Sequence, residues 1–232
     1  MTNGSLELDI EGLEGPLGQR VYTALRDRIL DMSLQPGSLL RKGALCEQLG
    51  VSRSPVAEAL GKLSSEGLVD IIPQSATRVS RMSLSDLEEE SFLREAVEAA
   101  AVSKVALERT EEQLTKLSRN LRLQSLLVED DDYQGFFEAD VEFHDLILEF
   151  TGFPKVVAAA SQLSLQLVRA RMLLLPEDGR PQEAVLEHQM ILDAIRAKDP
   201  EMARQRMTVH LRQLIDRIAP LEREHPGFFR PT

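Results

Sequence analysis

The spacing of apolar residues changes abruptly near Leu68, and this change limits the folds that the chain can adopt. Before Leu68, apolar side chains recur every three to four residues, which predicts helices over about 17–29, 41–49 and 55–66. Residues 68–72 and 77–79 are rich in β-branched side chains and flank a turn-forming segment, which predicts a two-stranded ribbon. Three helices followed by a ribbon is the element order of a winged helix-turn-helix.

The start of the third predicted helix has the residues of a DNA-reading element. Gly50 permits the tight turn before it, Ser54 is a candidate N-cap, and Pro55 would occupy the first helical position. Ser52, Arg53 and Ser54 therefore stand at the helix end that enters the major groove in helix-turn-helix proteins. Serine hydroxyls can bind phosphate, and Arg53 can contact a guanine edge or a phosphate. The alternative is that this segment only caps a core helix and Arg53 is a solvated charge.

From Ser83 onward, the pattern predicts helices only, separated by turns rich in Asp, Gly and Pro. We expect helices over about 85–107, 110–129, 132–150, 155–175, 180–198 and 200–219. The predicted fold is therefore mainly α: a winged helix-turn-helix followed by an all-helical antiparallel bundle. The predicted parts are a flexible tail (1–15), a DNA-binding domain (16–81), an effector- and metal-binding domain (82–222) and a C-terminal tail (223–232).

Charge and cysteine content narrow the setting in which this chain works. The net charge is −11, yet residues 16–81 hold nine Lys and Arg against six Asp and Glu. A basic region in an acidic chain permits phosphate contacts there. The single cysteine, Cys46, has no partner within the chain, which favours a reducing compartment. With neither a secretory signal nor a long apolar run, we expect a cytoplasmic protein that does not enter a membrane.

The segment 49–69, with Pro36 and Gly37 before it, resembles the winged helix-turn-helix of the GntR family of bacterial transcription regulators. The resemblance covers about residues 17–80. It implies a homodimer that reads an inverted repeat in double-stranded DNA through Ser52, Arg53 and Ser54.

The chain departs from this family pattern at positions that are often basic or glycine. Ala57 and Gly61 stand where basic residues are common, and Ser75 and Ala76 replace a basic-Gly pair at the tip of the wing. An arginine contact to a base contributes about 1–3 kcal/mol of discrimination, so we expect a weaker operator or one read differently. Four other basic residues could compensate, or could be ordinary solvated charges: Arg41, Lys42, Lys62 and Arg78.

Three histidines in the helical region are placed where they could converge. Asp140 and His144 are four residues apart, and so share one helix face. His188 and His210 are equidistant from the turn at 199–200, so an antiparallel hairpin would bring them level. Three nitrogens and one oxygen suit Zn²⁺, Ni²⁺ or another late divalent metal. Each histidine taken singly is better explained as a core or surface residue, but the joint spacing of the three favours a metal site. His225 lies in the predicted tail.

Residues 85–222 resemble the all-helical FCD ligand-binding domain of the FadR-type branch of the GntR family. The matching pieces are 93–98, Asp140 with 143–144, 187–188 and 210–211. The resemblance implies that Asp140, His144, His188 and His210 bind a divalent metal, which coordinates a carboxylate effector. Arg94 is the first candidate for the effector's carboxylate, with Arg169 and Arg171 as weaker ones. An ion pair between Arg94 and Glu98 is an equally good interpretation of Arg94.

The function predicted by these features is transcription regulation, with a small organic or sugar acid modulating operator affinity, and not enzymatic activity. A metal-dependent hydrolase using the Asp/His site is the alternative, because such a site can activate water. A helical scaffold that binds only protein is a third hypothesis, but it leaves the segment 52–54 and the wing unexplained. The sequence does not identify the effector, the operator, the metal or the sign of regulation.

Overall fold

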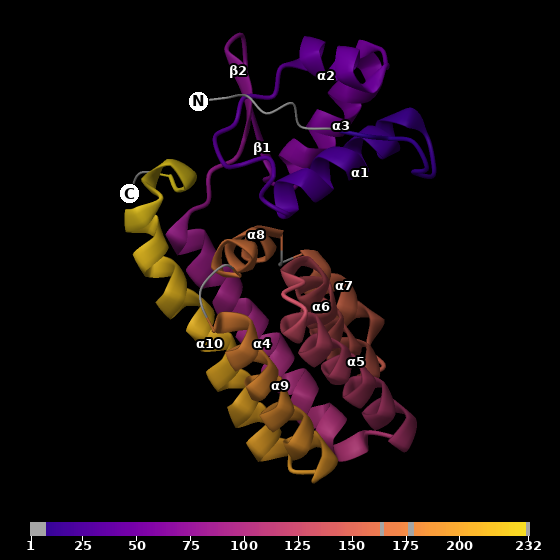
Figure 1. The fold of residues 1–232 in the computed structure, drawn as a ribbon, viewed down its shortest axis with the longest axis vertical. Coiled ribbons are helices and arrows are strands. Elements are labelled where there is room, and N and C mark those ends of the chain that lie inside the picture. Colours follow the sequence, from indigo (N-terminus) through magenta and orange to yellow (C-terminus); the bar gives the residue numbers. More distant parts are fainter. Residues whose placement is uncertain (1–7, 163–164, 176–178, 231–232) are drawn as a thin grey trace. The chain divides into compact units, whose positions relative to one another are not determined.

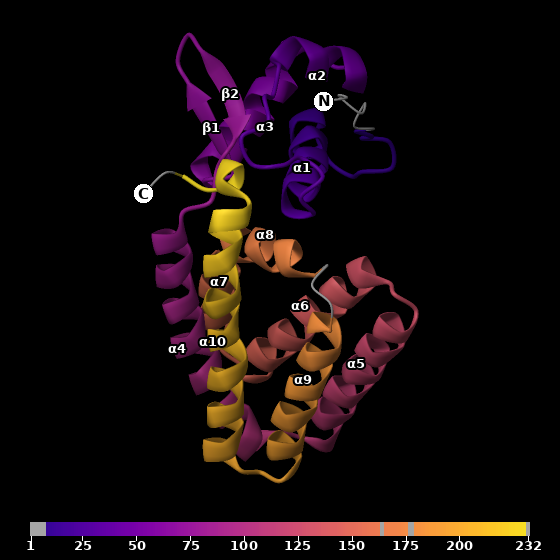
Figure 2. The same ribbon diagram turned by 60° about the vertical axis from the view of Figure 1, so that its left-hand side comes forward.

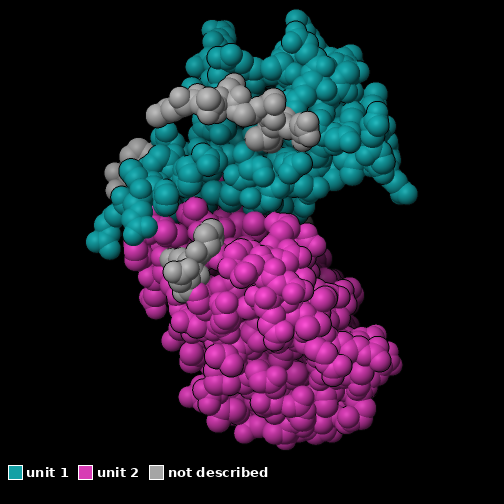
Figure 3. All heavy atoms as spheres, in the orientation of Figure 1, with its two compact units in different colours: residues 1–83, 222–232 teal, residues 84–221 magenta. Residues whose placement is uncertain are grey.

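The chain divides into two compact units, coloured separately in Figure 3. The computed structural model describes residues 8–162, 165–175 and 179–230. The first unit comprises residues 1–83 and 222–232, and the second comprises residues 84–221. The C-terminal residues thus belong to the same unit as the N-terminal region.

The first unit is a winged helix-turn-helix, as the element order predicts (Figures 1 and 2). Its elements are α1 (Leu17–Leu30), α2 (Lys42–Leu49), α3 (Arg53–Ser65), β1 (Val69–Ile72) and β2 (Ala76–Val79). The two strands are antiparallel, and Val69 lies opposite Val79. α1 packs against α3 over side chains that are fully buried: Val21, Leu25, Val56, Leu60 and Leu63.

The turn before α3 uses Gly50 as predicted, but the helix begins earlier than the sequence suggests. Gly50 ends α2 in the left-handed conformation, with a φ of 63°. Ser52, not Ser54, is the N-cap residue, and α3 starts at Arg53. Pro55 therefore lies within the first turn rather than at its first position. The first turn tolerates proline there because its N–H groups have no partner within the helix.

The two segments that we predicted as separate tails contribute buried residues to the first unit. Leu8 and Ile10 are buried, and Arg20 donates from Nε to the Ile10 carbonyl at 2.9 Å. Their alternation with acidic residues directs the apolar side chains inward. At the other end, a 3-10 turn, η1 (Pro226–Phe228), precedes Phe229, which is 2% exposed.

A short backbone pairing holds this C-terminal segment in place. The Met82 amide donates to the Phe228 carbonyl at 2.9 Å, and the Arg230 amide donates to the Met82 carbonyl at 2.7 Å. Met82 itself is buried. The residues following the last helix are thus part of the folded unit that contains the wing, in contrast to the predicted tail at 223–232.

The second unit is helical throughout its described part, as Figures 1 and 2 show. Its helices are α4 (Leu84–Glu108), α5 (Glu111–Glu129), α6 (Tyr133–Phe150), α7 (Pro154–Gln162), α8 (Leu165–Leu174), α9 (Arg180–Arg196) and α10 (Pro200–Glu224). The single helix predicted over 155–175 is wrong, because α7 and α8 are separate helices on either side of 163–164, which lie outside the described residues. No glycine or proline occurs between 155 and 175, so the sequence carries no local signal of a break.

The core of the second unit lies where α4, α5, α6 and α9 pack together. Phe143 and Ile147 of α6 and Ile191 of α9 are fully buried in it. α10 joins this core through Met207 and Leu211. The core is therefore built from the same helices that carry the three candidate histidines. Within the described ranges, no helix is long and apolar enough to cross a membrane.

Candidate metal centre and nucleic-acid interface

Three histidines from three helices meet inside the second unit. His144 comes from α6, His188 from α9 and His210 from α10, and all three are buried. The Nε2 atom of His210 lies 3.2 Å from Nε2 of His188 and 3.3 Å from Nε2 of His144. His188 and His210 are thus level across the α9–α10 hairpin, as the hairpin argument predicted.

The other ring nitrogen of each histidine contacts an oxygen acceptor from a different helix. Nδ1 of His144 lies 2.6 Å from a Glu98 oxygen, and Nδ1 of His210 lies 2.6 Å from a Glu187 oxygen. Nδ1 of His188 lies 2.8 Å from Oε1 of Gln124. These oxygens accept hydrogen bonds, so each Nδ1 carries the proton and donates it. The three Nε2 lone pairs therefore point toward one another.

The Gln124 amide is itself fixed by a chain of hydrogen bonds. Its Nε2 donates to Oδ1 of Asn120 at 2.7 Å, which leaves Oε1 to accept from His188. Asn120 in turn donates to Oε2 of Glu142 at 2.7 Å. Gln124 is fully buried, so its amide has few alternatives to this arrangement. The tautomer of His188 is consequently set by residues of α5 and α6.

This arrangement of donors fits a divalent metal ion. Three converging lone pairs cannot hydrogen-bond to one another, and they repel unless a cation lies between them. With metal–nitrogen distances of about 2.0–2.1 Å, two imidazole nitrogens on one ion are about 3.0–3.4 Å apart. The two Nε2 separations given above fall in this range. Three imidazole nitrogens suit a late divalent metal such as Zn²⁺ or Ni²⁺.

The electrostatics of the site keep the His188 and His210 imidazoles neutral. Burial lowers the pKa of His188 and of His210 well below the usual value, and the positive charge of Arg180 acts in the same direction. Burial alone would raise the pKa of Glu98, but the charge of Arg94 and hydrogen bonds from Arg94 and His144 hold that pKa below its usual range. Glu98 is thus an ionised acceptor for His144.

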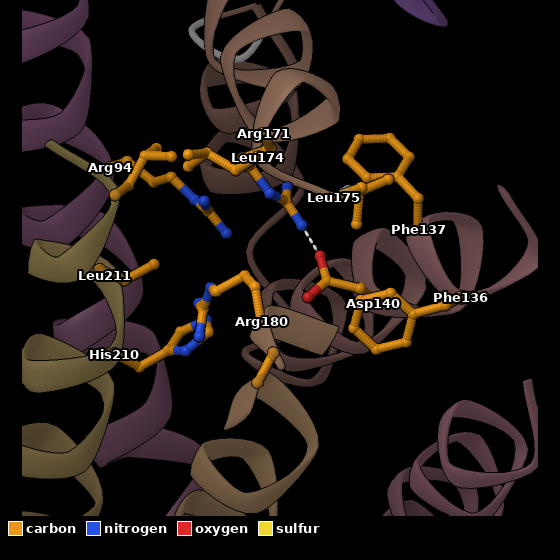
Figure 4. A pocket seen from close by; sticks show the side chains of 12 residues that line it. Arg94, Phe136, Phe137, Asp140, Arg171, Leu174, Leu175, Arg180, His210 and Leu211 are labelled. Carbon is orange, nitrogen blue, oxygen red and sulfur yellow. Dashed lines mark ion pairs between the residues drawn. The ribbon is translucent and has the colours of Figure 1, made fainter. Parts of the chain in front are cut away.

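Asp140, the fourth predicted ligand, lies at the edge of the histidine cluster. Its Oδ1 atom is 3.6 Å from Nε2 of His188, while Oδ2 pairs with the guanidinium of Arg171. Figure 4 shows Arg171 of α8 and Asp140 of α6 meeting across the pocket. Among the residues that the structure describes, the three histidines form the one group of potential metal ligands within 4.8 Å of one another. Asp140 is therefore close to the histidines but engaged by an arginine.

A pocket that is partly open to solvent adjoins the cluster. His210 and Asp140 line it, together with three arginines from three helices: Arg94, Arg171 and Arg180. Arg94 donates from Nε to Glu98 at 2.5 Å, and Arg180 donates from Nη1 to Glu187 at 3.2 Å. Burial lowers the pKa of Arg171, as do the charges of Arg94 and Arg180.

The predicted effector-binding arginines have different surroundings. Arg94 lines the pocket and also forms the ion pair with Glu98, so both interpretations of Arg94 apply together. Arg171 lines the pocket too, whereas Arg169 is fully buried in α8 and donates to Gln166. Arg180 was not predicted from the sequence, nor were the roles of Glu98, Gln124 and Glu187 as histidine acceptors. Each acceptor lies on a different helix from the histidine that it contacts, so sequence spacing carries no signal of these contacts.

A hydrolase at this site would also need a general base, and the two carboxylates of α6 nearest His144 in sequence, Glu142 and Asp145, lie away from the pocket. Glu142 and Asp145 line a different pocket of α6, together with Glu138 and Glu149. Glu142 is also hydrogen-bonded to Asn120. Neither side chain is among the described residues that line the pocket beside His210.

In the first unit, the segment at the start of α3 is exposed. Ser52, Arg53 and Ser54 are all solvent-accessible, and the Ser52 side chain does not cap the helix. The N–H groups of the first turn are therefore free to bind a phosphate. Ala57 and Gly61 follow on the exposed side of α3, and a Cβ atom added at Gly61 would meet open space. Both positions therefore carry small, uncharged residues.

The four other basic candidates differ in how they are held. Arg41 is the N-cap residue of α2 and Lys42 its first residue, and both are exposed. Lys62 instead faces α1, where Nζ donates to Gln19 at 3.2 Å and lies 3.8 Å from the centre of the Tyr22 ring. Arg78 of β2 donates from Nη1 to the Gly37 carbonyl at 3.0 Å.

Comparison with known proteins identifies both units. Residues 17–79 match the family described as "Bacterial regulatory proteins, gntR family", and residues 91–213 match the "FCD domain". An "Uncharacterized HTH-type transcriptional regulator in unstable DNA locus" from Streptomyces ambofaciens is 34% identical over 90% of this chain and 88% of its own length. The chain belongs to the GntR family of bacterial transcription regulators. It therefore combines a DNA-binding winged helix-turn-helix with an FCD effector-binding domain.

Other GntR-family proteins align over nearly the whole chain. The "HTH-type transcriptional repressor RspR" of Escherichia coli (strain K12) is 28% identical over 92% of this chain and 94% of its own length. Among solved structures, "E. coli McbR/YncC" superposes with a TM-score of 0.76 at 24% identity, covering 90% of this chain and 99% of that one. The similarity in structure supports the fold of both units.

Proposed function

We propose that this GntR-family regulator binds an inverted-repeat operator as a cytoplasmic homodimer, and that a metal-bound small organic acid changes its operator affinity. The observation that carries the proposal is the convergence of three Nε2 atoms whose Nδ1 atoms each donate to an oxygen acceptor. His144, His188 and His210 would hold a divalent metal such as Zn²⁺ or Ni²⁺, with Asp140 as a fourth ligand. The metal would supply a positive centre for an effector carboxylate.

The pocket beside the histidines supports an anionic effector. Arg94 and Arg171 approach the same space as His210, and guanidinium groups bind carboxylates through paired hydrogen bonds (Figure 4). Phe137 packs against Arg171, whose guanidinium carbon lies 5.0 Å from the ring centre. A small organic acid would therefore meet positive charge and an apolar wall together.

The DNA-binding part of the proposal rests on the start of α3. Arg53 would contact a base or phosphate, and Ser52 and Ser54 would contact phosphates with the first-turn N–H groups. Arg41, Lys42 and Arg78 would add phosphate contacts from α2 and the wing. We expect Lys62 to contribute least to DNA binding, because its ammonium group contacts Gln19 and Tyr22 of α1.

An effect of the effector on DNA binding requires two states with different affinities for each ligand. His210 lies on α10, and this helix contains Pro220 and continues to Glu224, so residues of the first unit follow His210 along the same helix. A rearrangement around His210 therefore has a covalent path to the first unit.

Metal content is the first test. The protein would be purified without an affinity tag or chelator, as wild type, His188→Ala and, as a control, His225→Ala. We expect about one divalent ion per chain in the wild type and in His225→Ala, and loss of the ion in His188→Ala. Metal missing from the wild type and not taken up on addition would refute the metal part and leave the DNA-binding part standing.

Operator affinity is the second test. Candidate operators near the gene would be titrated with metal-loaded and metal-stripped protein at fixed salt, because phosphate contacts make affinity depend on salt. We expect specific binding that changes when a small organic acid is added to metal-loaded protein only. No specific binding to any inverted repeat at low salt would contradict the proposed operator.

A further inference from the structure

With a divalent metal on the three histidines, the adjoining pocket would hold more positive charge than one carboxylate can neutralise. Building on the proposed function, we infer that the effector is a diacid with an apolar body, in preference to a monoacid or a sugar acid. The inference rests on the charges that surround the pocket, on the unused donors of its arginines and on the chemistry of its remaining walls.

The first argument is the balance of charge. Arg94, Arg171 and Arg180 contribute three positive charges, and their partners Glu98, Asp140 and Glu187 contribute three negative charges. These six charges cancel. Glu183 also lies 4.0 Å from Arg180, but it is half exposed and pairs with Arg217.

Counting the described residues, a divalent metal on the three imidazoles would therefore leave an excess of two positive charges in this site. Buried net charge is costly unless an opposite charge accompanies it. A dianionic ligand restores neutrality, whereas a monocarboxylate leaves one positive charge uncompensated.

The second argument concerns the donors of the arginines. A guanidinium has five N–H donors, and the carboxylate partners above use only part of them. Arg94 uses Nε on Glu98, and Arg180 uses Nη1 on Glu187. Arg94 and Arg171 extend into the pocket from α4 and α8, as Figure 4 shows. One anionic group can be bound by the metal, and a second can be bound by these guanidinium groups.

The third argument concerns the rest of the wall. Apart from His210, every described lining residue is either charged or apolar, so no described Ser, Thr, Asn or Gln side chain faces a ligand there. The apolar part is formed by Phe136, Phe137, Leu174, Leu175, Leu211 and Leu214. A ligand hydroxyl against these side chains would lose its hydrogen bonds to water and gain none. The pocket thus favours methylene or aromatic groups between the two acids.

The test is a matched series of ligands on the full-length, metal-loaded protein, with affinities from calorimetry. Each straight-chain diacid from succinate to adipate is compared with the monoacid of the same length, and adipate is also compared with its hydroxylated counterpart, glucarate. We expect the best diacid to bind at least about tenfold more tightly than its monoacid. We expect glucarate to bind at least about tenfold more weakly than adipate for the same reason. Butyl phosphate tests whether one doubly charged group suffices.

Variants locate the second anionic group. Arg171→Gln and Arg180→Gln should each reduce the diacid-to-monoacid preference toward one, while monoacid affinity changes less than about threefold. Arg206→Gln, which removes an exposed arginine of α10, should leave the preference unchanged. Metal content is measured for every variant, so loss of the metal is distinguished from loss of the anion contact.

Several outcomes would overturn the inference. Monoacids that bind as tightly as diacids would overturn it and leave the proposed effector site standing. If glucarate binds as tightly as adipate, the ligand does not need an apolar body. If butyl phosphate binds more tightly than every diacid, the ligand does not need two separate acid groups. If no acid binds although metal and operator binding are intact, the inference fails together with the proposed effector site.

Discussion

The two units of this protein present their candidate functional groups in opposite ways. In the winged helix-turn-helix, Arg53 and Ser54 are exposed at the end of a helix and take no part in the core. In the helical unit, His144 and His188 are buried and pack against the core residue Phe143. Function and stability are therefore separable in the first unit and joined in the second.

Phe143→Ala should produce the largest loss in the second unit. The Phe143 ring is fully buried and stacks on His188, with ring centres 4.5 Å apart. Removing a buried phenylalanine costs about 3–5 kcal/mol of unfolding free energy. We expect this loss in chemical denaturation, together with reduced metal content. Phe92→Ala on α4 is the control, because Phe92 is 71% exposed. If the unfolding free energy falls as expected but metal content does not, function and stability are separable in the second unit as well.

Phe229→Ala tests whether the C-terminal segment stabilises the DNA-binding unit. Phe229 is buried beside the pairing with Met82, so the substitution should cost about 3 kcal/mol, at the lower end for a buried phenylalanine. Operator affinity measured on the folded protein should change little. Phe228→Ala, at a half-buried ring that stacks on His225, should cost less. Equal stabilities for the two variants would show that the pairing contributes little in solution.

Gln124→Met should weaken metal binding while the three histidines remain. Methionine keeps the volume but removes the acceptor of the His188 Nδ1–H group. Loss of such a partner weakens metal affinity by about 10–100-fold. Competition with a fluorescent chelator would measure the change, with Gln189→Met on the exposed side of α9 as control. An unchanged affinity would mean that the His188 tautomer does not depend on Gln124.

Arg53→Ala should lower operator affinity by about 1–3 kcal/mol and leave unfolding free energy within about 0.5 kcal/mol. The side chain is exposed and outside the core, so its loss should lower operator affinity without lowering the unfolding free energy. Fluorescence anisotropy at fixed salt would measure it. Arg28→Ala is the matched control, because it removes an equal charge from the end of α1. If both variants weaken binding equally, the loss is one of net charge rather than of a specific contact.

Ala57→Arg should give the smallest effect, a gain in operator affinity of about 1 kcal/mol with an altered sequence preference. Ala57 is exposed on α3, and Gly61 one turn later leaves room for a longer side chain. Affinity would be compared on the operator and on variants at each base pair. An affinity and preference that both stay the same would show that position 57 does not face the DNA.

Much of the fold follows from local patterns. The winged helix-turn-helix was predictable because each element has its own period, and Gly50 marks the turn between α2 and α3. Most helices of the second unit were predictable from the turns that separate them. The division of 155–175 into α7 and α8 was not, because apolar periodicity continues without a glycine or proline. Leu8, Ile10 and Phe229 were missed because short terminal segments carry too few residues for a period.

The candidate metal centre was predictable only in part. His188 and His210 are equidistant from the turn at 199–200, so any antiparallel hairpin with this turn brings them level. Their Nε2 atoms are 3.2 Å apart in the structure. Asp140 and His144 share a helix face for the same local reason. Their acceptors were not predictable, because His144 and Glu98 are 46 residues apart and His188 and Gln124 are 64 apart.

Local sequence patterns set the order of the helices and strands, the exposed start of α3 and the helix faces that carry the histidines. These properties depend on neighbours within one or two turns, and their periods can be counted along the chain. The tertiary structure alone decided which carboxylates and amides hold the imidazoles, that Arg180 joins Arg94 and Arg171, and that Phe229 packs in the first unit. Those contacts depend on how separate segments pack, and packing is set by the whole core rather than by any one segment.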